Sequence, residues 1–384
     1  MRKIRLCSIQ PHAERGGSDQ ALLRMLCSLP RDEFECHMVV PSEPPLRSEL
    51  DAAGVSVHVV PMRRISGSHR LVDWVAYALA WPLTVGRLVA LFRRIDVDVV
   101  HTNSFHSWYG WAAAAIARRP HVWHGREIVV QSRAALALER FLIARFSARV
   151  LSMSHAIADQ LPGVDVTVVH ETPDPGEFHP SRAGHFRARV GIPDDVFLVG
   201  AAGRVDTWKG FDVLLDAFTL VRAARDDVQL VIAGGTVRGK EALHTELGAR
   251  AAETTGAHWV GPRDDIPELL ADVDLFVLPS TEPEPYGLVL VEALMSGVRV
   301  VATDAGGPRE ILDDARPGSG HLVPVRDATA MARTIVAALD EQPTTSTAHR
   351  AARQPRRAPE PERFAAIFRS VVDGRTASAR GRVG

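Results

Sequence analysis

The stretch Asp274-Leu-Phe-Val-Leu278, together with the segment that follows it up to Gly297, decides the fold of this chain. The stretch is short, apolar and without polar alternation, which is typical of a parallel strand covered by helices on both faces. After a turn, a helix is expected to begin near Tyr286. The same order of strand, turn and helix recurs along most of the sequence. It predicts an α/β protein with one doubly wound sheet in each half.

The expected strands lie in both halves of the chain. In the first half they are Ile4–Ile9, His37–Val40, Val55–Val60, Val97–His101, His121–His124, Arg149–Ser152 and Val166–Val169, and in the second half Val196–Ala202, Val228–Ala233, Ala257–Gly261, Leu275–Pro279, Arg299–Ala302 and His321–Val323. Ligands of such sheets bind beyond the carboxyl ends of the strands. We therefore expect two Rossmann-like domains that face each other across a ligand-binding cleft.

The chain is expected to divide at Thr172–Pro180, where proline and glycine are dense. These residues interrupt regular structure, so we expect an N-terminal domain over 1–176 and a C-terminal domain over 177–341. Residues 342–384 are expected to form a linker, a helix at about 361–373 that packs back on the N-terminal domain, and a disordered tail.

Length and composition limit the classes of function. The chain has 384 residues, enough for two domains, and its net charge of −1 provides no basic field for nucleic acid. Its three cysteines lack the spacing of a zinc site or a disulfide framework and are expected to be buried thiols in a reducing cytoplasm. No signal peptide is expected, because Met1–Lys3 leads directly into a strand. The most apolar stretch, Leu71–Phe92, is interrupted by Asp73 and Pro82, so we do not expect it to span a membrane.

The strongest chemical signal lies between Glu284 and Glu292. Glu284 precedes the expected helix and Glu292 lies about two turns inside it. A carboxylate in that position suits bidentate hydrogen bonding to the vicinal hydroxyls of a ribose. The amides of Gly287, Leu288 and Val289 lie at the helix N-terminus, where a diphosphate is well placed. An acidic loop followed by a surface glutamate is the alternative, but the combined pattern favours a nucleotide site.

A second signal is Gly203-Arg-Val-Asp-Thr-Trp-Lys-Gly210, which follows the expected strand Val196–Ala202. Two cations on one such loop would neutralise a diphosphate, Arg204 through its planar guanidinium and Lys209 as a point charge. The alternative is a basic turn without a ligand.

These two segments resemble motifs of glycosyltransferase family 4. The first is similar to the form PS-x-x-EPFG-LVLLEAMA-x-G and the second to GR-L-x-x-x-KG-x-D-x-L. The resemblance implies the GT-B fold and a transfer that retains the anomeric configuration of the sugar. It also implies that Glu284 lies near the transferred sugar, that Glu292 binds the ribose, and that Arg204 and Lys209 stabilise the leaving group. Glu282 offers a competing register, but the eight-residue offset favours Glu284.

Further similarity lies in the first half. Gly16 and Gly17 follow the first expected strand and match the Gly-Gly loop that faces the donor phosphates and the acceptor in the family. Val122-Trp-His-Gly-Arg-Glu127 resembles the strand whose final histidine faces the transferred sugar. His124 is thereby implied to contact a sugar hydroxyl or to polarise the transition state, and a structural histidine is the alternative.

The resemblance thus implies a set of site residues. The catalytic residues are His124, Arg204, Lys209 and Glu284; the donor-binding residues are Gly16, Gly17, Gly203, Arg204, Lys209, Gly287, Leu288, Val289 and Glu292; and the acceptor-side candidates are Asn103, Arg126 and Glu127. Asn103 is placed there by Asp98-Val-Val-His-Thr-Asn-Ser104, which resembles another strand end of the family.

One segment departs from the family pattern. Where the family usually has P-N-G-V-D, this chain has Val169-His-Glu-Thr-Pro-Asp174, so that Glu171 and Thr172 replace Asn and Gly. The geometry of the turn, and with it the acceptor side, is expected to differ. Otherwise the resemblance covers about residues 4–340 and is tightest over 199–312.

The transfer is expected to be metal-independent. No Asp-x-Asp motif lies on a suitable loop, and Arg204, Lys209 and the helix amides would replace a cation. The co-substrate is expected to be a UDP- or GDP-sugar, with no other cofactor. The expected acceptor is a hydroxyl of a small molecule, a glycan or a lipid-linked molecule in polysaccharide, glycolipid or natural-product synthesis. The oligomeric state has no signal in the sequence.

The enzyme is expected in the cytoplasm, and one amphipathic segment suggests contact with the inner face of the membrane. Its aromatic residues are accompanied by arginine pairs, which suits a lipid-linked acceptor. Packing of this helix against its own sheet is the alternative. The aromatic residues are Trp74, Tyr77, Trp81 and Phe92.

Other functions on the same fold are a nucleotide-sugar epimerase, a phosphorylase-like enzyme and a non-catalytic nucleotide-sugar-binding subunit. Isomerisation of a donor without acceptor would identify the epimerase. The presence of Arg204, Lys209, Glu284 and Glu292 argues against a binding subunit.

Overall fold

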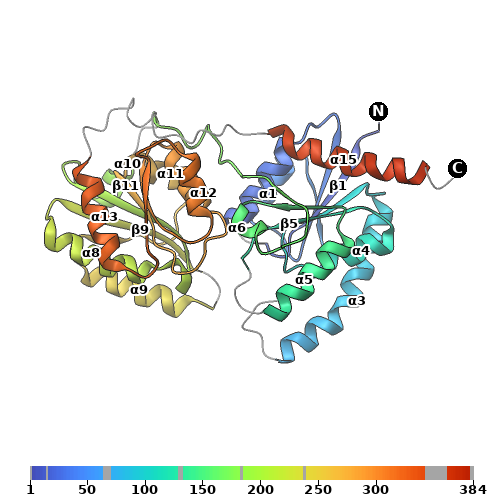
Figure 1. The fold of residues 1–384 in the computed structure, drawn as a ribbon, viewed down its shortest axis with the longest axis horizontal. Helices are drawn as coiled ribbons and strands as arrows, with labels where there is room; N and C mark the ends of the chain where they lie inside the picture. The colour runs from blue at the N-terminus through green and yellow to red at the C-terminus, as the bar shows by residue number, and fades with distance from the viewer. Residues whose placement is uncertain are drawn as a thin grey trace. The chain divides into compact units, whose positions relative to one another are not determined.

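Each half of the chain forms one parallel sheet, and the chain separates into two units (Figure 1). The N-terminal unit comprises residues 1–171 and 359–384, and the C-terminal unit comprises residues 172–358. The computed structural model describes residues 2–13, 16–63, 71–128, 133–181, 185–236, 239–341 and 361–380. The expected linker at 342–360 and the last residues of the expected tail, 381–384, lie outside these ranges.

The N-terminal sheet has seven strands in the order β3-β2-β1-β4-β5-β6-β7. The strands are β1 Ile4–Ile9, β2 Phe34–Val40, β3 Ser56–Val59, β4 Val99–Thr102, β5 His121–Gly125, β6 Arg149–Ser152 and β7 Val166–Val168. All the pairings are parallel. The strand order reverses direction between β1 and β4, so the loops that follow these two strands diverge at a topological switch point, where ligands bind in such folds.

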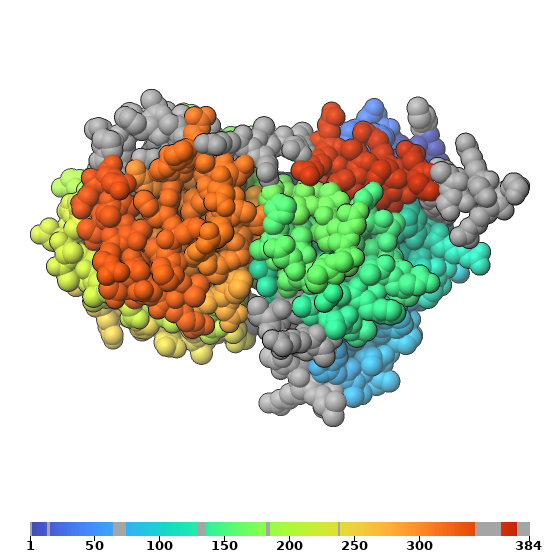
Figure 2. Space-filling model, in the orientation of Figure 1, coloured from blue at the N-terminus to red at the C-terminus, as the bar shows by residue number. Residues whose placement is uncertain are grey.

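Helices cover both faces of this sheet. They are α1 Gly17–Ser28, α2 Arg47–Ala52, α3 Leu71–Arg94, α4 Tyr109–Ala117, α5 Arg133–Phe146, α6 His155–Ala158 and α15 Pro361–Arg380. One hydrophobic cluster includes Leu22 of α1 and Phe368 of α15, and the other includes Leu88 of α3 and Ala113 of α4. The last helix therefore completes the first of these clusters, and Figure 2 shows α15 in red at the surface of this unit.

The C-terminal sheet has six strands in the order β10-β9-β8-β11-β12-β13. The strands are β8 Phe197–Val205, β9 Val228–Thr236, β10 Ala257–Trp259, β11 Leu275–Leu278, β12 Arg299–Thr303 and β13 Gly320–Val323. The helices are α7 Phe186–Val190, the 3-10 turn η1 Thr207–Lys209, α8 Phe211–Ala224, α9 Glu241–Glu253, α10 Ile266–Asp272, α11 Leu288–Met295, α12 Gly307–Asp314 and α13 Ala328–Asp340. Here the switch point lies between β8 and β11.

Three local expectations differ from the structure. β8 extends to Val205, so Gly203 and Arg204 lie on the strand and pair with β9 instead of forming a loop. The helix α11 begins at Leu288 and not near Tyr286, because Gly287 has a φ of +102°, a left-handed conformation that helix residues do not adopt. Cys27 is exposed, whereas Cys7 and Cys36 are buried.

Candidate active site

At the switch point of the C-terminal unit, the side chains of Lys209 and Glu284 contact each other. The Nζ atom of Lys209 donates a hydrogen bond of 2.7 Å to Oε2 of Glu284, and Ser280 Oγ donates one of 2.8 Å to the same oxygen. The two ion-paired side chains are only 12% and 8% exposed. The lysine thus neutralises a carboxylate that would otherwise repel a phosphate at this position.

The loops after β8 and β11 are held together by their backbones. Thr281 N donates a hydrogen bond of 2.7 Å to the carbonyl of Trp208. Gly210 has a φ of +68°, and a Cβ atom there would lie 2.1 Å from the carbonyl oxygen of Pro279. Only glycine fits this close approach, and Gly210 therefore fixes the position of the preceding Lys209.

The loop after β12 holds the backbone of Glu284. Glu284 N donates to the carbonyl of Ala305 at 3.1 Å, and Gly307 N donates to the carbonyl of Glu284 at 2.8 Å. Gly306 has a φ of +78°, and a Cβ atom on it would lie 2.2 Å from the Glu284 carbonyl oxygen. These hydrogen bonds fix the backbone of Glu284 and therefore limit where its carboxylate can lie.

The N-terminus of α11 follows directly after Glu284. Gly287 is the N-cap residue, and Leu288 and Val289 are partly exposed. The first amides of a helix have no partner within the helix, and they favour an anion. Glu292 lies one turn further and is partly buried, whereas the competing Glu282 is exposed. The structure therefore brings together Lys209, Glu284 and the helix N-terminus, and it leaves Glu282 in solvent.

Arg204 and Gly203 lie at the end of β8. Arg204 is exposed and Gly203 is partly buried. Because their strand ends at the switch point, both remain candidates for a donor contact.

The acceptor-side candidates of the N-terminal unit form a buried polar chain at its own switch point. Arg126 Nε donates to Asn103 Oδ1 at 2.7 Å, and Asn103 Nδ2 donates to Gln10 Oε1 at 2.8 Å. Gln10 Nε2 donates to Asp19 Oδ1 at 3.0 Å. Arg126 also forms an ion pair with Glu171, the residue that departs from the family pattern.

Gly16 and Gly17 immediately precede the helical turn that contains Asp19, the last member of this polar chain. Gly16 is the N-cap residue of α1 and Gly17 is its first residue. Asp19, in the first turn of the same helix, is 4% exposed. Gln10 and Asp19 were not predicted from the sequence. Gln10 directly follows the first strand, and Asp19 lies in the first helical turn after the glycine pair, where ligand contacts concentrate.

Glu127 organises a loop. Its carboxylate accepts hydrogen bonds from Ser104 Oγ, from Phe105 N at 3.1 Å and from Arg126 N at 3.2 Å. Glu127 therefore fixes the residues that follow Asn103 after β4.

His124 is fully buried and packs within its own unit. Its Nδ1 lies 3.3 Å from Nε2 of His101, and its ring packs against Phe364 of α15, with 6.0 Å between the ring centroids. Burial and the nearby Arg126 charge hold the pKa of His101 and His124 well below the usual range, so both imidazoles are neutral. This environment is that of a core histidine, and contact of His124 with the sugar stays a prediction.

Two Asp-x-Asp pairs occur at the amino ends of strands. Asp96 and Asp98 precede β4 and contact Arg2 and Arg5. The second pair precedes β11, and its Asp274 forms an ion pair of 2.8 Å with an arginine of α7. Asp272, the other member of this pair, accepts a hydrogen bond of 2.9 Å from the backbone N of Arg187. Both pairs lie at the sheet edges opposite the switch points.

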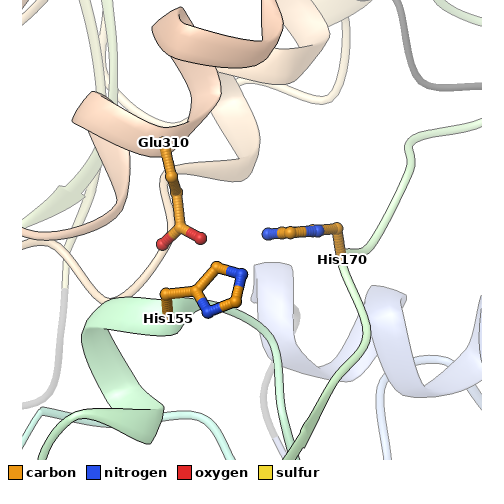
Figure 3. A group of neighbouring side chains, drawn as sticks. All are labelled: His155, His170 and Glu310. Carbon is orange, nitrogen blue, oxygen red and sulfur yellow. The ribbon is translucent and has the colours of Figure 1, made fainter.

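Figure 3 shows two other histidines, which sequence reasoning had not selected. His155 begins α6 and His170 follows β7, and their ring centroids lie 5.9 Å apart. Glu310, drawn with them, belongs to α12 of the C-terminal unit. Both histidines belong to the N-terminal unit.

Family models match both units. The model "Glycosyl transferase 4-like domain" matches residues 16–163, and "Glycosyl transferases group 1" matches residues 184–355. The chain is 31% identical over 329 residues to a GDP-mannose-dependent alpha-mannosyltransferase of Mycobacterium tuberculosis, covering 80% of each chain. It is 32% identical over 383 residues to D-inositol 3-phosphate glycosyltransferase 1 of Catenulispora acidiphila, covering 89% of this chain and 86% of that relative.

The fold has close structural neighbours as well. The crystal structure of Anabaena Alr3699/HepE in complex with UDP and glucose superposes with a TM-score of 0.77 at 23% identity, covering 97% of this chain and 99% of that chain. This likeness identifies the fold as GT-B. Together, the family models and the relatives show that the chain belongs to glycosyltransferase family 4 and is a hexosyl-transferring enzyme that uses a nucleotide sugar.

Proposed function

We propose that the donor diphosphate binds at the switch point between β8 and β11, and that Lys209 and the α11 N-terminus stabilise the leaving group without a metal ion. The observation that carries this proposal is the buried ion pair between Lys209, on the loop after β8, and Glu284, which lies just before that helix. A lysine and helix amides can offset the charge that develops on a departing phosphate. Both Asp-x-Asp pairs lie at the opposite sheet edges, where three of their four carboxylates are ion-paired with arginines and Asp272 accepts a backbone hydrogen bond, so neither is placed to hold a metal at the donor diphosphate.

We assign the remaining roles from the positions of Glu292 on α11, of Glu284 just before it and of Arg204 at the end of β8. Glu292 would accept the vicinal ribose hydroxyls, Glu284 would orient the transferred sugar, and Arg204 would contact the phosphates from the end of β8. Retention follows if the acceptor hydroxyl attacks from the face that the phosphate leaves, with a phosphate oxygen taking the proton. No side chain of this chain is proposed as a nucleophile.

For the donor, we propose a GDP-sugar, with GDP-mannose first. The support is the 31% identical relative named as GDP-mannose-dependent. The HepE structure with UDP and glucose supports the fold alone at 23% identity. The test is a thermal-shift series with GDP-mannose, UDP-glucose and ADP-glucose, because a ligand stabilises the protein that binds it.

The activity itself is tested by nucleotide release. The enzyme with GDP-mannose and an acceptor should release GDP at a rate that EDTA does not change. Loss of activity in EDTA, restored by Mg²⁺, would contradict metal independence. Conversion of the donor to an isomeric nucleotide sugar without acceptor would contradict transfer itself.

We also propose a cytoplasmic enzyme that binds an anionic membrane surface through α3. The segment Trp74–Arg94 is the one helix in the described ranges that is long and apolar enough to cross a membrane. It instead packs on α4 through its buried side. Its exposed side carries Trp74, Val75, Leu79 and Leu83, which are 40–73% exposed.

The aromatic face expected from the sequence is divided by this packing. Tyr77 and Phe92 are buried and Trp81 is partly buried, so of the expected aromatics only Trp74 lies on the exposed side. Arg93 and Arg94 end the helix and are exposed, which suits anionic lipid. Sedimentation with vesicles of phosphatidylglycerol should exceed that with phosphatidylcholine and should fall in L79D/L83D. Equal binding of this variant and the wild type would contradict the proposal.

A further inference from the structure

The N-terminal switch point has a polar chain that ends in charged groups with open hydrogen-bonding positions. Asp19 Oδ2, Arg126 Nη2 and Glu171 Oε2 are buried and have no hydrogen-bond partner within the described ranges. Asp19, Arg126 and Glu171 are each no more than 6% exposed. Buried polar atoms are normally paired, and an unpaired one costs about 1–3 kcal/mol. Three of them at one ligand-binding edge therefore call for a ligand that supplies both donors and acceptors.

These groups come from separate elements that converge at the carboxyl edge of the sheet. Gln10 follows β1, Asn103 follows β4 and Arg126 follows β5, while Glu171 lies just beyond β7. The hydrogen bonds all point in one direction, from the guanidinium through Asn103 and Gln10 to the Asp19 carboxylate. Bonds aligned in this way strengthen one another and hold the side chains in place.

The charge balance limits the kind of ligand. The group contains two carboxylates and one guanidinium: Glu171 pairs with Arg126, and Asp19 lies at the other end of the polar chain, so with a neutral His12 the formal charge is one negative unit. The ring of His12 lies 3.4 Å from Asp19, and Ser18 Oγ lies 3.5 Å from Asn103. Arg126 is paired with Glu171, and Asp19 adds a second carboxylate to the group, so the excess of negative charge disfavours a phosphate here. The Lys209–Glu284 pair, in contrast, is balanced one to one.

We propose that this group binds a neutral, polyhydroxylated acceptor, such as a sugar residue, and that Glu171 excludes acceptors with a phosphate at this position. Vicinal hydroxyls can donate to the open oxygens of Asp19 and Glu171 and accept from Arg126. An acceptor phosphate would meet the two carboxylates instead. The inference rests on the proposed donor site and specifies the acceptor class of the same reaction. It also accounts for the replacement of the usual Asn by Glu171.

The first test uses inorganic phosphate as the probe and needs no knowledge of the natural acceptor. In E171Q the guanidinium of Arg126 loses its counter-charge, so phosphate affinity should rise by about tenfold or more over wild type, as expected for one charge-assisted contact. The control is R126M/E171Q, which removes the guanidinium and should return phosphate affinity to the wild-type value. The control also separates this position from phosphate bound beside Lys209, which is unchanged in all three proteins.

The outcomes are distinct. A folded E171Q protein without a gain in phosphate affinity would overturn the proposal, and so would a gain that persists in R126M/E171Q. Binding of GDP-mannose or UDP-glucose, measured on the same proteins, should not change in E171Q. Absence of nucleotide-sugar binding in the wild type would refute the proposed donor site instead, so the two failures can be told apart.

A second measurement covers the case that E171Q does not fold, since it leaves a buried cation unpaired. Wild-type enzyme is assayed with matched acceptors, methyl α-mannoside against mannose 6-phosphate and myo-inositol against inositol 3-phosphate. The neutral member of each pair should have the higher kcat/KM, by about tenfold or more if one like-charge contact opposes the phosphate. A preference for the phosphorylated members would overturn the proposal.

Discussion

Replacing Lys209 by Met removes the cation of the proposed donor site and keeps the unbranched apolar stem, one atom shorter. In the wild-type structure Lys209 Nζ lies 2.7 Å from Glu284 Oε2, and both side chains are nearly buried. With an effective dielectric constant of about 20, the Coulomb attraction at that distance is about 6 kcal/mol. Desolvation offsets most of this, so the net contribution expected is that of a charge-assisted hydrogen bond, about 1.5–3 kcal/mol.

Two quantities should change in K209M. The free energy of unfolding of the C-terminal unit should fall by about 1.5–3 kcal/mol, because Glu284 is left as a buried charge with Ser280 as its remaining donor. The kcat of sugar transfer should fall by about 10²–10³, the usual effect of removing one group that stabilises developing charge. Urea unfolding followed by circular dichroism and a nucleotide-release assay measure the two effects separately.

The double variant K209M/E284Q distinguishes pairing from independent effects. Because Lys209 and Glu284 are paired, the double variant should be more stable than the sum of the single losses predicts, with a coupling of about 1.5–3 kcal/mol. Its activity should be close to that of the worse single variant, because residues that act together are not additive. Stability losses that add within about 0.5 kcal/mol would refute the pairing. Wild-type transfer by K209M would refute the role in catalysis.

Three further predictions concern the rest of the structure. G306A should unfold the loop around Glu284 and abolish donor binding, because a Cβ atom would lie 2.2 Å from the Glu284 carbonyl oxygen; calorimetric titration with the donor checks this, and unchanged affinity would contradict it. F368A should destabilise the N-terminal unit by about 3–5 kcal/mol, since the side chain is fully buried, and should leave the nucleotide-stabilised unfolding step of the other unit in place. Burial lowers the pKa of His121 to about 3 and that of His101 and His124 well below the usual range, so the unfolded state binds more protons below pH 6.5 and stability falls as pH falls. From pH 6.5 to 5.5 the loss should be about 1 kcal/mol for each of the three histidines, as urea unfolding at several pH values would show, and a flat profile would contradict it.

The sequence was sufficient to predict the sheets because their strands are short apolar segments covered on both faces. Each of the thirteen expected strands corresponds to a strand of the structure, with ends that differ by a few residues. The Lys209–Glu284 pair was also within reach, since both residues lie in segments that resemble family motifs. Their direct contact was not, because it depends on Gly210 and Gly306 bringing three loops together.

The residues that sequence reasoning placed less well are those whose environment depends on distant segments. His124 lies one residue before the end of β5, but its side chain lies on the face that α15 covers, and that helix comes more than two hundred residues later. The ion pair between Glu171 and Arg126 could not be predicted either. Arg126 follows β5 and Glu171 lies beyond β7, and no local sequence pattern links the two segments. The exposed side of α3 could not be assigned because the helix is apolar on most sides and only its packing on α4 distinguishes them.

The most direct test of the central claim is the anomeric configuration of the product. The enzyme is given GDP-α-mannose and a neutral mannoside acceptor, and the product is followed by NMR from the first turnover. The account predicts an α-linked mannoside, formed at the rate at which GDP is released and unaffected by EDTA. A β-linked product, or an isomerised donor with no new glycosidic bond, would contradict it.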